Sequence, residues 1–84
     1  KMEKKVEKHR TIYSFENKDY SGTIKTEFIV HGKNLDIYQH CTDLDGHEWD
    51  ECIRLAPGDY KNFLNGINTA YRLILNTVDH GTNK

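Results

Sequence analysis

The hydrophobic period of the chain changes between Ile53 and Tyr60. Before this stretch, about forty residues alternate between apolar and polar side chains, with the period of two that is typical of β-strands. After it, apolar residues recur at the i, i+3, i+4 and i+7 spacing of an amphipathic helix: Tyr60, Phe63, Leu64, Ile67, Ala70, Tyr71 and Ile74. Pro57 suits the first turn of a helix, and Asp59 places a carboxylate near the positive end of the helix dipole. The sequence therefore predicts a small sheet followed by one helix that begins at residue 57.

Four strands are expected before the helix. The runs 10–16, 23–30, 35–42 and 47–55 are separated by turn residues, and Asp43-Leu44-Asp45-Gly46 is a strong hairpin signal because Asp-Gly supports a positive φ. Residues 1–9 have no clear period and are expected to form a flexible basic leader. The predicted fold class is α+β, a four-stranded antiparallel meander followed by one C-terminal helix. The domain is expected at 10–78, with a tail at 79–84.

The size and composition of the chain limit its class. With 84 residues there is room for one domain, and a domain this small buries a modest fraction of its surface, which favours a homodimer. No apolar run approaches the ~20 residues that span a bilayer. Because residues 1–5 also lack the layout of a secretory signal, we expect an intracellular protein without a membrane partner.

The densest polar cluster, residues 40–52, has ligand types for a metal but not the spacing. There is no Cys-x-x-Cys or paired His-x-x-x-His, and the Asp-x-Asp-Gly fragment lacks the distal Glu of a calcium-binding loop. His40 and Cys41 are adjacent on a strand and therefore point to opposite faces. We expect no metal, no cofactor and no enzymatic activity; an enzyme using Cys41 or Cys52 would need an unusually reactive thiol. A Cys41–Cys52 disulfide is geometrically conceivable, but two buried thiols are commoner in a reducing compartment.

The net charge of −1 conceals an asymmetry. Residues 1–10 contain five basic and two acidic residues, a balance of +3, and the other 74 residues have a balance of −4. The cations at this end that could form a basic arm are Lys4, Lys5, Lys8 and Arg10.

One face of the predicted sheet mixes cations with aromatic rings. If Ile24, Phe28, Leu35, Ile37, Ile53 and Leu55 point toward the helix, the opposite face presents Lys25, Tyr38, His40 and Arg54. The first strand adds either Tyr13 and Phe15 or Ile12 and Ser14 to this face. Bases of a single-stranded nucleic acid stack on flat rings while Lys and Arg follow its phosphates. The same side chains are also ordinary cross-strand pairing residues, and Trp49 is either a dimer contact or a stacking platform.

The segment 53–64, Ile-Arg-Leu-Ala-Pro-Gly-Asp-Tyr-Lys-Asn-Phe-Leu, resembles the end of the positive-cofactor-four family of single-stranded-DNA-binding transcriptional coactivators. In that family a Gly-Ile-Ser-Leu strand leads into a helix whose first turn contains an aromatic residue followed by Leu. The Pur repeat has the same order of elements. The resemblance covers residues 10–75 in topology and is specific over residues 35–64.

The resemblance implies a unit that pairs with a second copy through its C-terminal helix and presents its sheet to single-stranded DNA or RNA. Leu35-Asp36-Ile37-Tyr38 would match the family's third strand, and Arg54 would lie near its basic fourth-strand segment. One departure is that Glu48, Asp50 and Glu51 are acidic where the family is rich in Lys and Gly. Phosphate binding depends on cation count through counterion release, so the basic N-terminal end would have to supply the missing charge.

Two functions are therefore expected from the sequence. The first is a homodimeric single-stranded nucleic-acid-binding protein, with a role in transcription regulation, whose binding residues are Lys25, Tyr38, Arg54, Tyr13, Phe15, Trp49, Lys8 and Arg10. The alternative is a protein-interaction module, a regulator or inhibitor, that presents the acidic hairpin 43–51 to a basic partner. The sequence does not distinguish DNA from RNA.

Overall fold

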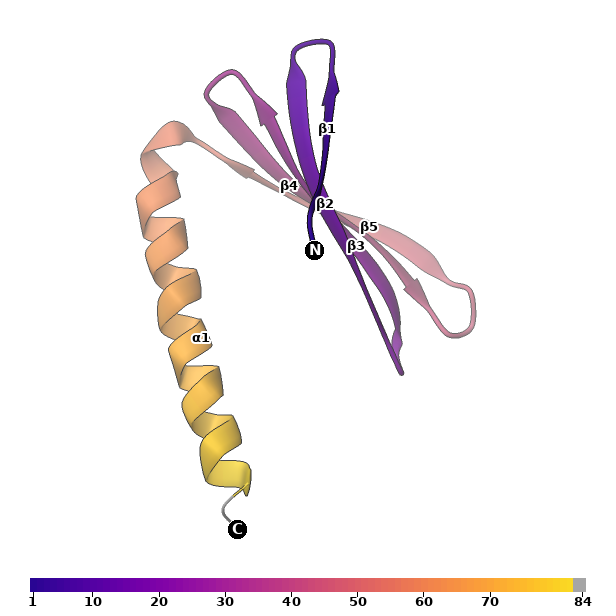
Figure 1. Ribbon diagram of the computed structural model, residues 1–84, viewed down its shortest axis with the longest axis vertical. Coiled ribbons are helices and arrows are strands. Elements are labelled where there is room, and N and C mark those ends of the chain that lie inside the picture. Colours follow the sequence, from indigo (N-terminus) through magenta and orange to yellow (C-terminus); the bar gives the residue numbers. More distant parts are fainter. Residues whose placement is uncertain (83–84) are drawn as a thin grey trace.

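Five strands and one helix follow one another in the computed structural model, which describes the main chain of residues 1–82 and the side chains of residues 1–77 (Figure 1). The strands are β1 (Glu3–Glu7), β2 (Arg10–Asp19), β3 (Gly22–His31), β4 (Asn34–Asp43) and β5 (Glu48–Leu55). A 3₁₀ turn, η1 (Pro57–Asp59), leads into α1 (Tyr60–Thr82). The strand order is β1-β2-β3-β4-β5, with every neighbour antiparallel. The α+β class, the meander and the start of helical structure at residue 57 are thus confirmed.

The N-terminal segment is not the flexible leader that we predicted. Residues 3–7 form β1, in which Val6 lies opposite Thr11 and Glu7 opposite Arg10. Lys8, in the turn to β2, has a positive φ of 51°. The sheet therefore has five strands instead of four. Of the tail expected at 79–84, residues 79–82 continue α1, and residues 83–84 lie outside the described residues.

Tight turns fix the register of the strands. At the start of β3, Gly22 has a φ of 141°, and a Cβ on it would lie 2.1 Å from the carbonyl oxygen of Thr42. In the β4–β5 hairpin, Asp43 N–H donates to the carbonyl oxygen of His47 at 3.0 Å, and Gly46 has a φ of 86°. The Asp-Gly hairpin predicted at 43–46 is therefore confirmed, and it sets Cys41 opposite Trp49.

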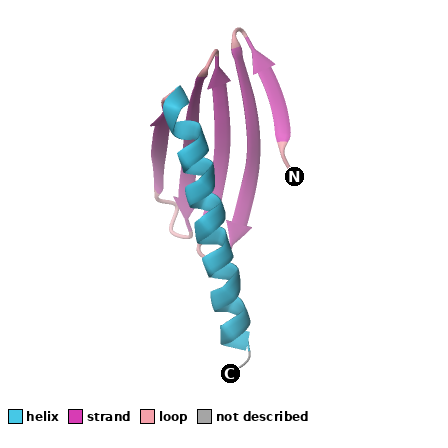
Figure 2. Ribbon diagram, turned by 90° about the vertical axis from the view of Figure 1, so that its left-hand side faces the viewer, coloured by secondary structure: helices cyan, strands magenta, loops and turns pink. Residues whose placement is uncertain are grey.

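The sheet has an apolar face and a polar face, because residues directly opposite on neighbouring strands share a face. We call the face toward α1 the helix-side face; its residues include Val6, Tyr13, Phe15, Ile24, Phe28, Val30, Leu35, Ile37, Cys41, Trp49, Ile53 and Leu55. The other face, here the outer face, carries most of the charged side chains of the strands. Figure 2 shows α1 passing in front of the helix-side face, with β1 at the edge farther from it.

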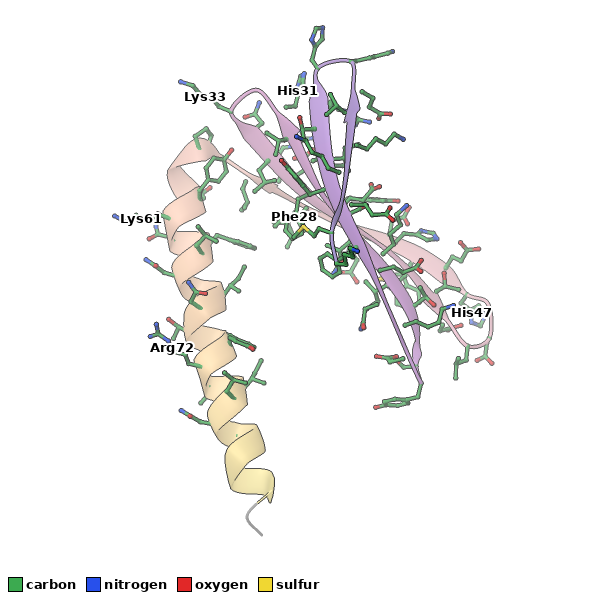
Figure 3. All side chains as sticks on the ribbon, viewed as in Figure 1. Phe28, His31, Lys33, His47, Lys61 and Arg72 are labelled. Atoms are coloured by element: carbon green, nitrogen blue, oxygen red, sulfur yellow. The ribbon has the colours of Figure 1, made fainter. Side chains whose placement is uncertain are left out.

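The helix stands away from the sheet. Its first two turns face the strands, where Tyr60, Phe63, Leu64 and Ile67 line an apolar cleft with Phe28, Leu35, Ile37 and Leu55. The Tyr60 hydroxyl donates to the carbonyl oxygen of Lys33, which ties the start of α1 to the β3–β4 turn. Beyond this point the helix and sheet diverge (Figure 1), while Lys61 and Arg72 point away from the sheet (Figure 3).

The space between helix and sheet leaves much apolar surface uncovered. Among residues 1–77 only Ile12, Thr26, Cys41 and Leu55 are buried. Ile53 on the sheet is 49% exposed, and Ile67 and Tyr71 on the helix are 50% and 58% exposed. The radius of gyration is 15.7 Å, whereas a compact domain of this length has about 12 Å. A single chain therefore does not close its own core.

Candidate nucleic-acid interface

The eight residues expected to bind nucleic acid are divided between the two faces. Lys25, Tyr38 and Arg54 lie on the outer face, as predicted, together with His40. The sequence left open which residues of β2 lie on this face. They are Ile12 and Ser14, and not Tyr13 and Phe15. Tyr13, Phe15 and Trp49 lie instead on the helix-side face. Lys8 lies in the β1–β2 turn and Arg10 on the outer face of β2.

The expected cations of the outer face have carboxylates beside them. Arg54 donates from Nε and Nη2 to the two carboxylate oxygens of Asp36, at 3.0 and 3.3 Å, from the directly opposite position on β4. Lys25 Nζ lies 4.0 Å from Glu27 Oε2. Arg10 pairs with Glu7, and this contact, followed by that of Lys5, lowers the pKa of Glu7. A phosphate on this face would compete with each of these carboxylates.

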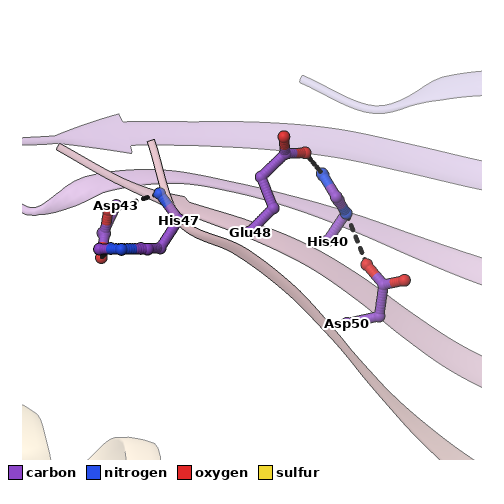
Figure 4. Close-up of polar contacts among 5 residues, drawn as sticks. All are labelled: His40, Asp43, His47, Glu48 and Asp50. Carbon is purple, nitrogen blue, oxygen red and sulfur yellow. Dashed lines mark hydrogen bonds and ion pairs between the residues drawn. The ribbon is translucent and has the colours of Figure 1, made fainter. Parts of the chain in front are cut away.

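His40 forms the most connected polar group on the outer face (Figure 4). Its Nδ1 lies 2.5 Å from Asp50 Oδ1 and its Nε2 lies 2.7 Å from Glu48 Oε1. Because each ring nitrogen faces a carboxylate, Asp50 first and then Glu48 raise the pKa of His40. Hydrogen bonding to Asp50 also raises the pKa of Tyr38. The ring and its two carboxylates thus join β4 to β5, and Tyr38 is held to the same cluster.

The helix-side face of β1 and β2 combines rings with a cation. Lys4 Nζ lies 6.0 Å from the centroid of the Tyr13 ring, and Tyr13 is 37% exposed. Phe15 stacks with Phe28, with ring centroids 6.2 Å apart and an angle of 29° between the planes. No carboxylate occupies a helix-side position of β1 and β2 from Lys4 to Asn17, or of β3 from Ile24 to Val30. This patch, the β1–β2 patch, comprises Lys4, Val6, Thr11, Tyr13 and Phe15.

Trp49 lies far from the β1–β2 patch, on the edge strand β5. It stands opposite Cys41 and lines a shallow pocket with residues of the β2–β3 turn, among them Ser21 and Gly22. Its indole Nε1–H donates to Glu51 Oε2 at 3.2 Å. Trp49 therefore belongs to the apolar surface that continues along β5 and is separate from the other two expected stacking residues.

The hairpin tip brings three possible metal-binding groups together. Ligand atoms of Asp43, Asp45 and His47 lie within 4.8 Å of one another. Asp43 Oδ1 accepts the main-chain N–H groups of Asp45 and His47 at 2.9 and 3.0 Å, and Asp43 Oδ2 lies 3.2 Å from His47 Nδ1. These bonds close the turn, so the arrangement of the three groups is accounted for by the hairpin; Figure 4 shows the contact between His47 and Asp43.

The two cysteines are on opposite faces and are both free thiols. Cys41 is buried on the helix-side face, and Cys52 is exposed on the outer face opposite Tyr38. The expectation that both thiols are buried was wrong for Cys52, because β5 is an edge strand whose outer face nothing covers.

Sequence reasoning missed two residues that shape these surfaces. Lys4 was assigned to a flexible arm, although its spacing of two from Val6 indicates a shared strand face. Asp36 was assigned no role, although it lies directly opposite Arg54 once the hairpin at 43–46 fixes the register. Both signals are periodicities of two, which become readable only when the pairing of neighbouring strands is known.

The fold defines a class, the α+β proteins with one antiparallel meander sheet and a C-terminal helix. Comparison of the chain with protein-family models, curated protein sequences and solved structures finds no significant match in any of the three. Among the described residues, no helix combines the length and the apolar character that a membrane crossing requires.

Proposed function

We propose that the protein binds single-stranded nucleic acid as a homodimer, with the β1–β2 patch as the binding surface. The observation that carries this proposal is the position of Lys4 beside the exposed ring of Tyr13. A base that stacks on Tyr13 displaces the Lys4 ammonium toward the adjacent phosphate. Ring and cation then act on the same nucleotide, as in other single-strand binding surfaces.

The charge of the β1 edge supports this choice of surface. Residues 1–10 carry a balance of +3, and they run from just before β1 to Arg10, the first residue of β2, at one edge of the sheet. On the outer face, Lys25 and Arg54 lie beside Glu27 and Asp36. The N-terminal cations therefore contribute more net attraction for phosphate than the outer face does.

The homodimer is proposed from the area that one chain leaves exposed. The chain exposes 7174 Å², about 2,000 Å² more than the roughly 5,200 Å² of a compact 9.8 kDa monomer. Stable interfaces bury about 800 Å² on each partner, and those of obligate homodimers bury more. Covering the space between α1 and β3–β5 with the helix of a second copy accounts for this excess and leaves the β1–β2 patch at the far edge free.

Binding to a labelled single strand of about 20 nucleotides tests the proposal by fluorescence anisotropy, beside a duplex control. Replacing a stacking ring costs about 1–3 kcal/mol, so Tyr13→Ala should weaken binding roughly 5- to 150-fold. Lys4→Ala should weaken binding and make it less sensitive to salt, because the salt slope falls by about 0.7 for each phosphate that the protein no longer neutralises.

Two controls locate the surface. Tyr20 is 90% exposed at the β2–β3 turn, so Tyr20→Ala removes an exposed ring outside the patch and should leave the affinity unchanged. Lys25→Glu with Arg54→Glu should have a smaller effect than Lys4→Glu. If the outer-face pair has the larger effect, the binding surface is the outer face; if no variant binds less tightly than the native chain, the proposal is wrong.

The second candidate function is binding of a basic protein surface by the β4–β5 hairpin. The hairpin lies at one end of the sheet, beside the β2–β3 turn (Figure 1), and residues 41–53 include five carboxylates and no Lys or Arg. This candidate predicts that changing Asp43, Asp45, Asp50 and Glu51 to their amides abolishes partner binding and leaves any nucleic-acid affinity intact. Absence of single-strand binding even at low salt would favour it.

A further inference from the structure

The outer edge of β5 has main-chain groups without a neighbouring strand. β5 is the last strand of the sheet order, and each of its residues from Glu48 to Arg54 is exposed. Asp43 N–H points toward β5, since it donates to His47, and hydrogen-bonding direction alternates along a regular strand. The N–H and C=O groups directed away from β4 therefore belong to Glu48, Asp50, Cys52 and Arg54. This edge is a ready template for another strand.

We infer that a second copy of the chain pairs with this edge, β5 against β5 and antiparallel, with the two-fold axis at Cys52. This inference goes beyond the proposed function, because it uses a surface that neither the helix contact nor the β1–β2 patch occupies. In this register Asp50 lies opposite Arg54 of the second copy, and the symmetry repeats that pair. Of the four outward-directed residues of each copy, Asp50, Cys52 and Arg54 then find main-chain partners, and Glu48 lies beyond the paired segment.

The side chains have groups available for the pairing. Arg54 uses Nε and Nη2 for Asp36, and a guanidinium has five N–H donors in total. Asp50 meets His40 through Oδ1, and its carboxylate, which Tyr38 also contacts, can accept further hydrogen bonds. On the helix-side face the same register sets Trp49 opposite Leu55 and Glu51 opposite Ile53 of the second copy. The apolar helix-side face then continues across the contact.

Neighbouring registers lack this complementarity. A symmetric pairing that keeps each face continuous must be centred on a residue, so the alternatives are centred on Asp50, Glu51 or Ile53. The first sets Asp50 against itself and the second sets Glu51 against itself, and directly opposed like charges are destabilising. The third shortens the pairing to residues 51–55 and sets Asp50 opposite Ala56, so that the Asp50–Arg54 pair is lost. The register centred on Cys52 pairs residues 49–55 without an opposed like-charge pair.

Cross-linking of the native full-length chain tests the contact without a mutation. Cys52 is exposed and Cys41 is buried, so a short bis-maleimide should join Cys52 to Cys52 of the second copy and produce a covalent dimer within minutes. Cys52→Ser should abolish the product, and the chain in urea should form at most a trace. Cross-linking no faster in buffer than in urea overturns the inference.

A charge exchange separates this contact from pairs within one chain. Asp50→Arg alone and Arg54→Asp alone set like charges opposite each other twice, so each should reduce the affinity of the contact about 10- to 30-fold. The double exchange restores both intermolecular pairs while still disrupting Asp36 with Arg54 and His40 with Asp50, and it should restore cross-linking. If the double variant cross-links as poorly as the single variants, the inference is wrong.

The variant Ile67→Glu, which places a charge on the apolar side of α1, distinguishes failure of the helix contact from failure of the β5 contact. This variant should retain the Cys52 cross-link, because Ile67 lies outside β5. Loss of cross-linking in Ile67→Glu means that the β5 contact does not form by itself, which contradicts the inference as stated.

Discussion

At the scale of single residues, His40 makes the stability of the sheet depend on pH. Asp50 and Glu48 raise its pKa above the ordinary 6.5, so its contribution is complete below the unfolded value and is lost as pH rises through the folded pKa. His40, and then Tyr38, lower the pKa of Asp50 below 3.8; its contribution is present above that value and is lost as pH falls through the folded pKa. The cluster therefore stabilises the fold most between about pH 4 and pH 6.5.

Urea unfolding at fixed protein concentration between pH 4 and pH 9 measures this dependence. The native chain should lose stability above pH 6.5, and His40→Gln should flatten that part of the profile. His47→Gln is the matched control, since His47 lies at the exposed hairpin tip and its ring contacts one carboxylate, that of Asp43, where His40 contacts two. Equal flattening by both variants would show that His40 is not the responsible group.

Two glycines give opposite expectations for the same substitution. Gly22→Ala should destabilise the fold by about 2 kcal/mol or more, because φ is 141° and the new Cβ meets the Thr42 carbonyl oxygen. Gly66 lies inside α1 with nothing within 4 Å of a new Cβ, so Gly66→Ala should stabilise the helix by about 0.5–1 kcal/mol. Chemical denaturation of both variants measures these changes. A loss at position 66 would indicate that another chain approaches that side of the helix.

At the scale of elements, the sequence predicts those whose hydrophobic period is regular. β2 to β5 alternate with a period of two, and Pro57 marks the start of helical structure. β1 was missed because Val6 is its only apolar residue, so an exposed edge strand gives almost no alternation. Its pairing depends on the β1–β2 turn and on the adjacent strand, which a segment read alone does not contain.

The same limit applies to the candidate site. Alternation correctly placed Lys25, Tyr38 and Arg54 on one face, because each position was counted from apolar neighbours on its own strand. The sequence left the face of Tyr13 and Phe15 open, since both sets of side chains on β2 contain an apolar residue. Register settles it: Tyr13 lies opposite Phe28, which faces the helix.

At the scale of the whole molecule, the uncovered helix predicts an association that depends on its apolar side. Ile67→Glu should break the helix contact, so that sedimentation velocity at micromolar concentration shows chains joined through β5 alone, and it should lower the melting temperature, because it places a charge in the proposed contact. Thr69→Glu, about half a turn away around the helix, is the control and should leave the native assembly unchanged. A native chain that sediments as a monomer at all concentrations would contradict the dimer.

The meander connectivity separates two stages of folding. Each strand pairs with the one made just before it, so the loops that close are short and the chain entropy lost at each closure is small. The sheet can therefore assemble one hairpin at a time while α1 is still being synthesised. In the proposed dimer, burial of its apolar face waits for a collision between two chains. Formation of strands is then a first-order event, and completion of the core is second-order, limited by how many chains are present.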